Sequence, residues 1–248
     1  MTNTKTIIKI DNLYKSFGTN VVLNGFTMDL KEGENVVVMG KSGSGKSVMI
    51  KCVIGLEKPD SGSILVMDKE INKLNREDLD ELRTEIGFLF QGSALYDSMS
   101  VRENLEFPLR RHTKKFGHIK DTTSLVMEAL ENVGLGHAID LMPNELSGGM
   151  KRRVALARTL ILKPKIILYD EPTTGLDPIT SKEIIQLMNS IQKEYNTSSI
   201  IITHDVDCAK AISDRMILLI DGINYIEGRF EEVEASTDPK VRAFFKEK

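Results

Sequence analysis

A glycine-rich loop that directly follows a short apolar run is the feature that most constrains how this chain folds. The apolar run covers residues 36–39, and residues 40–47 then read GKSGSGKS, with the spacing G-x-x-x-x-G-K-S. Glycines at this spacing let consecutive backbone N–H groups curl around a phosphate, while the next helix points its N-terminus at the anion. The sequence therefore predicts a buried strand, a phosphate-binding loop and a helix over residues 46–55.

Each residue type in this loop has an expected contact with a nucleotide. Lys46 is expected to pair with the β- and γ-phosphates, and Ser47 is expected to ligate magnesium. The alternative, a flexible glycine turn without a ligand, is disfavoured by the flanking predicted strand and helix. The residues expected to hold the nucleotide in this loop are Gly40, Ser42, Gly43, Ser44, Gly45, Lys46 and Ser47.

The length and composition of the chain fit one α/β domain, or one such domain with a sizeable insertion. It has 248 residues, 41% of them hydrophobic, and a net charge of −3 that argues against a nucleic-acid partner. No apolar run approaches the roughly 18 residues of a membrane span, and the polar start lacks the apolar core of a signal peptide. We therefore expect a cytoplasmic location. Cys52 and Cys208 belong to no metal-spaced cluster and are expected to be buried, reduced thiols.

Hydrophobic periodicity divides the chain into a strand-rich start, a helical middle and a region of alternating strands and helices. Residues 101–163 are mostly helical in pattern and are interpreted as a helical insertion. Short apolar runs that alternate with helices indicate a parallel sheet covered on both faces. The expected strands are 7–13, 21–30, 36–39, 64–67, 86–90, 166–169 and 199–203, and helices are expected at 76–83 and 181–195.

Two consecutive carboxylates end the apolar run 166–169. In α/β folds ligands bind at the carboxyl edge of the sheet, where Asp170 and Glu171 are expected to lie. Asp170 is expected to hold Mg²⁺, and Glu171 is expected to polarise the water that attacks the γ-phosphate. The alternative is that these acids cap the following helix. It is disfavoured because a phosphate loop needs a metal-binding carboxylate at a neighbouring strand end.

A second helix start with glycines occurs at residues 146–150, which read LSGGM. Ser147 is a candidate N-cap, and Gly148 and Gly149 leave the first N–H groups of the helix unobstructed, so this end can also bind an anion. Taken alone, the motif is equally consistent with an ordinary serine-capped helix. One chain therefore carries two predicted phosphate-binding helix ends.

Taken in order, these motifs resemble the nucleotide-binding domain of ATP-binding cassette (ABC) proteins, from about residue 8 to residue 228. The loop 40–47 matches Walker A, residues 147–149 the signature motif, and residues 170–171 the Walker B aspartate and catalytic glutamate. By the same resemblance, Phe17 is expected to stack on adenine, with Tyr14 as the rival aromatic and core packing as the alternative role of Phe17. Three further matches are the Q-loop glutamine Gln91, the D-loop aspartate Asp177 and the switch histidine His204. Each has a purely structural alternative. Gln91 could simply end a strand, Asp177 could cap a helix, and His204 could be an ordinary histidine at the end of a strand.

The resemblance implies a fold, a reaction and an assembly. The fold is α/β: a P-loop NTPase (RecA-like) core with an N-terminal antiparallel β subdomain over residues 1–90 and 164–248, and an inserted helical subdomain over residues 91–163. The reaction is hydrolysis of ATP with Mg²⁺. The assembly is a head-to-tail homodimer in which the signature helix of one chain completes the Walker A site of the other. A GTPase is disfavoured because residues 72–75 read NKLN, with asparagine where guanine selection needs a carboxylate.

Residues 89–109 resemble the ATPase subunit of Mla-type lipid transporters, as do residues 146–150, 173–181 and the tail 238–245. This resemblance implies phospholipid trafficking through a membrane permease and an MCE-domain lipid-binding protein, with the ATPase on the cytoplasmic face of the inner membrane. The permease is expected to bind an apolar surface around residues 95–107. The alternatives are the ATPase of another ABC importer or exporter, or a soluble ABC ATPase of iron–sulfur cluster assembly. The basic segment 110–120 is either solvated helix surface or a contact with anionic headgroups.

Overall fold

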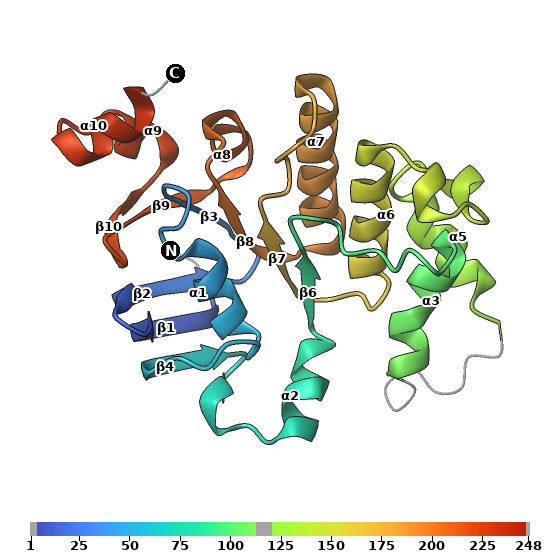
Figure 1. The fold of residues 1–248 in the computed structure, drawn as a ribbon, viewed down its shortest axis with the longest axis horizontal. Coiled ribbons are helices and arrows are strands. Elements are labelled where there is room, and N and C mark those ends of the chain that lie inside the picture. Colours follow the sequence, from blue (N-terminus) through green and yellow to red (C-terminus); the bar gives the residue numbers. More distant parts are fainter. Residues whose placement is uncertain (1–3, 113–120, 247–248) are drawn as a thin grey trace.

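The computed structural model describes residues 4–112 and 121–246, and within these it contains two β-sheets (Figure 1). The smaller sheet is antiparallel, in the order β2-β1-β4-β5. Along β1, Ile8 and Ile10 are buried while Lys9 between them is exposed, as alternation on a one-sided sheet requires. The predicted N-terminal antiparallel sheet is therefore present. Its strands are β1 (Thr6–Phe17), β2 (Asn20–Lys31), β4 (Ser61–Val66) and β5 (Lys69–Glu70).

The larger sheet has the order β10-β9-β3-β8-β7-β6, and all its pairs are parallel except β10 with β9. Its central strands are buried at every residue, because both faces are covered. The α/β fold class is confirmed. The strands are β3 (Asn35–Met39), β6 (Ile86–Leu89), β7 (Ile166–Asp170), β8 (Ser198–Thr203), β9 (Arg215–Ile220) and β10 (Ile223–Gly228).

The three helices predicted with bounds, 46–55, 76–83 and 181–195, begin and end close to those positions. The first ends at Val53 rather than residue 55, with Gly55 already in the left-handed region at φ 67°. The long helix α7 starts at Pro178, ahead of the predicted residue 181, because Asp177 caps it and proline fits its first turn. The α-helices are α1 (Lys46–Val53), α2 (Arg76–Arg83), α3 (Val101–Arg111), α5 (Thr123–Glu131), α6 (Gly148–Leu160), α7 (Pro178–Tyr195), α8 (Val206–Ile212), α9 (Phe230–Glu234) and α10 (Pro239–Lys246).

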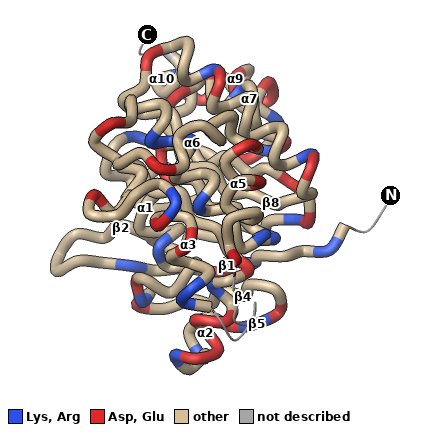
Figure 2. Tube along the Cα trace, turned by 90° about the vertical axis from the view of Figure 1, so that its right-hand side faces the viewer, with Lys and Arg blue, Asp and Glu red and all other residues tan. Residues whose placement is uncertain are grey.

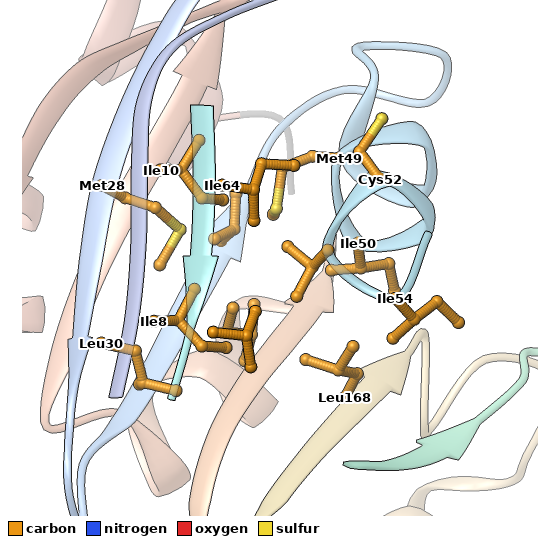
Figure 3. Close-up of a cluster of buried hydrophobic side chains, with 14 of the residues drawn as sticks. Ile8, Ile10, Met28, Leu30, Met49, Ile50, Cys52, Ile54, Ile64 and Leu168 are labelled. Atoms are coloured by element: carbon orange, nitrogen blue, oxygen red, sulfur yellow. The ribbon is translucent and has the colours of Figure 1, made fainter. Parts of the chain in front are cut away.

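Three apolar clusters hold these elements together. The first joins the antiparallel sheet, α1 and one face of the parallel sheet (Figure 3). The second covers the other face with α6, α7 and α8, so that along β3 Val36 and Val38 belong to one cluster and Val37 and Met39 to the other. The third lies among α3, α5 and α6. Helix α6 contributes side chains to the second and third clusters, which makes it the shared wall between sheet and helical insertion.

The structure also bears on the predictions about the cysteines, membrane spans and charge. Both cysteines are buried and unpaired, and burial raises the thiol pKa to about 11 for Cys52 and to about 12 for Cys208. No helix in residues 4–112 and 121–246 is both long and apolar enough to cross a membrane. Basic and acidic residues are intermixed along the chain (Figure 2). Of the basic segment 110–120, residues 113–120 lie outside the described residues.

Candidate functional site

The glycine-rich loop lies at the carboxyl end of β3 and leads directly into α1. Gly43 and Gly45 have φ of 79° and 100°, conformations that residues with a side chain rarely adopt. Gly40 and Gly45 also face close neighbours: a Cβ at Gly40 would lie 2.6 Å from Ser44 Oγ, and one at Gly45 would lie 2.8 Å from the Val22 carbonyl oxygen. The glycine spacing in the sequence is thus required both by backbone conformation and by packing.

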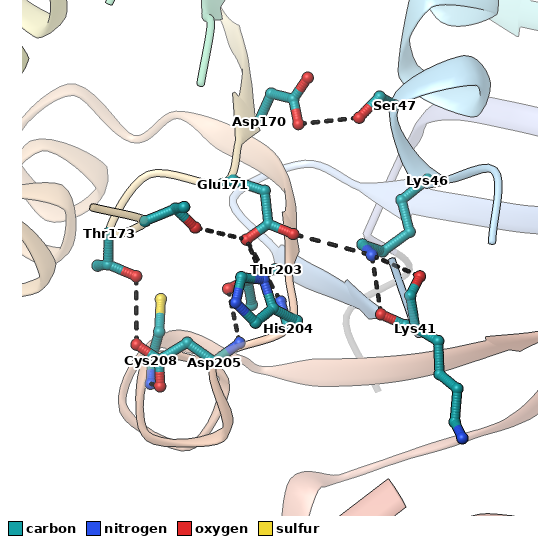
Figure 4. A network of polar contacts seen from close by, with 12 residues as sticks. Lys41, Lys46, Ser47, Asp170, Glu171, Thr173, Thr203, His204, Asp205 and Cys208 are labelled. Carbon is teal, nitrogen blue, oxygen red and sulfur yellow. Dashed lines mark hydrogen bonds and ion pairs between the residues drawn. The ribbon is translucent and has the colours of Figure 1, made fainter. Parts of the chain in front are cut away.

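Lys46 is the buried cation of this loop, with only 6% of its surface exposed. Its Nζ donates to the carbonyl oxygens of Gly40 at 2.8 Å and Lys41 at 3.1 Å, and it lies 3.8 Å from Glu171 Oε1 (Figure 4). Burial lowers the pKa of Lys46, while the carboxylates of Glu171 and Asp170 act in the opposite direction. The ammonium is therefore held at the loop, beside the carboxylate of Glu171.

A hydroxyl and a carboxylate meet where α1 begins. Ser47 Oγ donates to Asp170 Oδ1 at 3.1 Å, linking the loop to the end of β7. Burial raises the pKa of Asp170, and the hydrogen bond from Ser47 opposes the rise. Two oxygen ligands of this kind fit Mg²⁺, which prefers oxygen and is bound by few protein groups together with substrate phosphates.

Glu171 follows Asp170 and is held in an unusual conformation. Its φ is 50°, in the left-handed region that a glutamate adopts only when its surroundings impose it. Its Oε2 lies 2.8 Å from His204 Nδ1 and accepts a hydrogen bond from Thr174 Oγ1 at 3.0 Å. The backbone strain directs the carboxylate of Glu171 toward both Lys46 and His204 (Figure 4).

Polar side-chain contacts also connect the segment that follows His204 to the segment that follows Glu171. Asp205 caps α8 by accepting from the N–H groups of Asp207 and Cys208 at 2.9 and 3.2 Å. Its other oxygen accepts from Thr173 Oγ1 at 3.2 Å. The side chain of His204 is 59% exposed, while its Nδ1 lies 2.8 Å from Glu171 Oε2, so the ring contacts both solvent and the carboxylate.

A cavity of about 510 Å³ brings together half of the predicted nucleotide-binding residues with Gln91, Glu171 and His204, while Gly40, Ser44 and Asp170 do not line it. Phe17 contributes an aromatic ring that is 46% exposed, and Lys15 Nζ lies 4.9 Å from the ring centroid. Tyr14 does not line this cavity; its hydroxyl packs instead where a Cβ on Gly25 would lie. The residues lining the cavity are Phe17, Val22, Ser42, Gly43, Gly45, Lys46, Ser47, Val48, Gln91, Glu171 and His204.

The signature motif lies elsewhere, at the start of α6. Ser147 is its N-cap, and its Oγ accepts from the Met150 N–H at 3.2 Å. A Cβ on Gly149 would lie 2.6 Å from Thr180 Cγ2, whereas one on Gly148 would be in ordinary contact with Leu176 at 3.7 Å. None of residues 147–149 lines the cavity that contains Lys46. Within one chain the two helix ends are not brought together.

Asp177 adopts the role that the sequence left as its alternative. It caps α7, its Oδ1 accepting from the N–H groups of Ile179 and Thr180 at 3.0 Å each. Hydrogen bonds from Thr180 lower the pKa of Asp177. Ile179 beside it is 73% exposed, a large apolar side chain in contact with solvent.

Sequence reasoning missed the hydroxyl groups that orient the site. Thr174 contacts the Glu171 carboxylate, and Thr173 contacts Asp205. The signal was present as two consecutive threonines that follow the carboxylates after Pro172, but only the fold shows which hydroxyl points at which acid.

Comparisons with known sequences identify relatives of this chain. The family model described as ABC transporter matches residues 23–174. A probable ribonucleotide transport ATP-binding protein of Mycobacterium leprae is 42% identical over 96% of this chain and 68% of its own length. A methionine import ATP-binding protein of Campylobacter jejuni is 38% identical over 97% of this chain and 76% of its own length. An intermembrane phospholipid transport system ATP-binding protein of Haemophilus influenzae is 37% identical over 98% of this chain and 91% of its own length.

A solved structure has the same fold. It is a dimeric ATP-binding cassette in a post-hydrolysis state, bound to ADP and Pi. The TM-score is 0.81 at 34% identity, and the match covers 90% of this chain and 98% of that one. The relatives carry names for three different transported substances, while all share the ATP-binding cassette.

Proposed function

Because this chain belongs to the ABC transporter family of ATP-binding proteins and is an ATPase, we propose that it energises phospholipid trafficking between membranes through a partner permease and an MCE-domain protein. The observation that carries the lipid assignment is the resemblance of residues 89–109 to Mla-type ATPases, together with the full-length similarity to the Haemophilus influenzae phospholipid protein. A ribonucleotide or methionine transporter is the second candidate, favoured by the identity to the relatives with those names.

The roles proposed for the site residues follow from their contacts. Phe17 stacks on the adenine, the N–H groups of residues 40–47 surround the phosphates, and Lys46 neutralises charge on the β- and γ-phosphates. Glu171 orients the attacking water, since its carboxylate lies between Lys46 and His204. His204 donates to the γ-phosphate and senses its loss. Positioning and charge neutralisation carry this kind of reaction, so fixed side chains are what it requires.

Magnesium is proposed to bind at Ser47 and Asp170, with Gln91 as a further oxygen ligand. Ser47 and Asp170 already lie 3.1 Å apart, and Gln91 lines the same cavity as Ser47. When bound there, the ion would neutralise phosphate charge. The protein's part is to hold these oxygens at the carboxyl edge of the sheet.

The functional unit is proposed to be a homodimer with composite ATP sites. Ser147, Gly148 and Gly149 lie outside the cavity of their own chain, so a second copy arranged head to tail would bring its signature helix to the phosphates. Asp177 and the exposed Ile179 would lie at the contact between the two copies. Hydrolysis removes the phosphate that both copies hold, and the dimer then opens.

The permease contact is proposed at the aromatic surface that follows Gln91. The rings of Tyr96 and Phe107 lie 4.9 Å apart between centroids, and Tyr96 is 43% exposed. Such a surface fits an apolar helix from a membrane partner. The chain would then lie peripherally on the cytoplasmic face of the inner membrane.

The test is to tag the chain, solubilise native membranes gently, and identify the co-purifying proteins and lipids by mass spectrometry. A permease with an MCE-domain protein and bound phospholipid supports the lipid assignment. A permease with a methionine- or nucleotide-binding partner contradicts it and supports the second candidate. Substitution of Tyr96 by Glu is expected to lose the permease while leaving the thermal stability of the chain unchanged.

A further inference from the structure

Arg152 has a buried guanidinium group, and none of the roles proposed above explains why it is there. It lies on α6 and is only 4% exposed. Its Nε has no hydrogen-bond partner, and the hydrogen bonds its other nitrogens make within the described residues go to backbone carbonyls. Burial lowers the pKa of Arg152, against the attraction of Asp170. A buried cation without a paired carboxylate costs free energy, so stability alone does not account for its position.

One end of the Arg152 guanidinium holds the backbone directly before Gln91. Its Nη1 donates to the Phe90 carbonyl oxygen at 2.8 Å. On the other side of Gln91, Arg158 of the same helix donates to the carbonyl oxygens of Ser93 at 2.9 Å and Ala94 at 2.8 Å. Helix α6 therefore donates hydrogen bonds to the backbone on both sides of Gln91, in the segment 90–94 that we call the Q-loop.

The backbone that Arg158 contacts after Gln91 is strained. Ser93 and Ala94 have φ of 62° and 48°, two consecutive left-handed residues with side chains. Such conformations persist only where surrounding contacts impose them. The Q-loop geometry therefore depends on the contacts that α6 makes.

The other end of the Arg152 guanidinium reaches the segment after Glu171. Its Nη2 lies 3.4 Å from the Thr174 carbonyl oxygen, at the long end of hydrogen-bond distance. The hydroxyl of Thr174 donates to Glu171 Oε2 at 3.0 Å. A chain of contacts thus runs from α6 through Thr174 to the carboxylate of Glu171.

We propose that Arg152 is a positioning residue: it couples the positions of Gln91 and Glu171 to the position of α6, the helix that Ser147 caps. The inference rests on the proposed function, since it assigns those two residues to hydrolysis. A guanidinium suits the role because its planar fork presents donors in two fixed directions, whereas an ammonium acts as a single point. Through this link, a displacement of the signature helix shifts the Q-loop and the segment that orients Glu171.

Anchoring of α6 does not require this charge. Val154 and Leu156 of α6 are fully buried in the apolar clusters. Arg153 pairs with Glu183 at 2.8 Å and donates to the Val133 carbonyl oxygen at 3.1 Å, away from the Q-loop. Arg152→Met leaves no carboxylate of the described residues without its ion-pair partner, but it removes a donor from the carbonyl oxygens of Phe90 and Thr174. The positioning role and a purely structural role therefore predict different outcomes for Arg152→Met.

The experiment compares Arg152→Met with Arg153→Met, its matched control, in the complex purified through this chain. Arg152→Met is expected to lower kcat about 10- to 100-fold with KM for ATP nearly unchanged, because misplaced groups slow the chemical step more than they weaken binding. Arg152→Lys is expected to recover part of the loss. Combined with Thr174→Val, the loss in kcat should be less than the product of the two single losses, since both act through Glu171.

A second measurement does not depend on turnover. Amide hydrogen exchange of the full chain is expected to be faster in peptides covering residues 88–95 and 171–177 in Arg152→Met, and unchanged there in Arg153→Met. Equal kcat in the two variants with unchanged exchange would overturn the proposal. Normal turnover in Glu171→Gln would instead reject the proposed catalytic base, while the exchange result would still report on the link through Arg152.

Discussion

The two anion-binding helix ends of this chain share a chemical principle and differ in how complete they are. At the start of α1 no side chain caps the helix, and Lys46, Asp170 and Glu171 surround the loop from within the same chain. At the start of α6 the Ser147 hydroxyl caps the Met150 N–H, and residues 147–149 do not line the cavity that contains Lys46 and Glu171. A helix end can be complete in one chain or require a second copy, and the motif alone does not distinguish the two cases.

The strongest way to break this comparison is to mix two inactive variants. Lys46→Ala damages the α1 end, and Ser147→Arg damages the α6 end. If each site combines the α1 end of one chain with the α6 end of another, mixed dimers contain one intact site, and random pairing restores about a quarter of wild-type ATP turnover. Steady-state ATPase assays of the separate and mixed variants measure this. No recovery on mixing would place both ends in the site of a single chain.

Glu171→Gln tests whether the α1 side supplies the base. The amide keeps the shape and the contact with Thr174 but cannot orient water as a carboxylate does. Turnover is expected to fall at least about 100-fold, within the range of general-base effects, while ATP binding is retained. Size-exclusion chromatography with ATP should then show a persistent dimer. Lys46→Ala is the control that should lose the dimer together with ATP binding.

Gly149 tests why the α6 end contains a glycine. Access of a ligand to the N–H groups is one reason, and close packing against Thr180 is a second. Gly149→Ala places a Cβ 2.6 Å from Thr180 Cγ2 and is expected to lower the free energy of unfolding by about 1–3 kcal/mol. Gly148→Ala meets only an ordinary contact at 3.7 Å and is the control. Chemical denaturation measures both. Thr180→Ser removes the obstructing methyl group and should restore Gly149→Ala, so failure of this rescue would contradict the packing explanation.

The smallest expected effect concerns the buried carboxylate at the α1 end. The pKa of Asp170 is raised in the folded state, so its ionised form costs stability above that raised pKa. The cost decreases as the pH falls through the folded pKa, and it is absent below the unfolded value, where both states are protonated. Without Mg²⁺, Asp170→Asn should therefore be more stable than the wild type at neutral pH, and the difference should shrink on acidification. Denaturant titrations across pH measure the difference, and a constant gap would contradict the assigned cause.

Much of the fold was predictable because its strongest signals are local. Alternating and continuous apolar runs predicted β1, β2 and β4 of the smaller sheet and β3, β6, β7 and β8 of the larger one, and helix α2 lies at the predicted residues 76–83. The last part of the chain was less predictable: β9, β10, α8 and α9 were not anticipated. Residues 216–220 of β9 are a continuous apolar run, so the signal for this strand is local. The short helices α8 and α9 have no such signal and are placed by packing on β3, β9 and β10.

The sequence by itself determined the nucleotide chemistry of this protein, because glycine spacing, a lysine–serine pair and paired carboxylates are local patterns with few other uses. Only the tertiary structure decided which groups meet. In the fold, Ser47 donates to Asp170, and Glu171, whose backbone is left-handed, contacts His204. Arg152 donates to the carbonyl oxygens of both Phe90 and Thr174. These contacts join residues far apart in the chain, and their geometry depends on how sheet and helices pack.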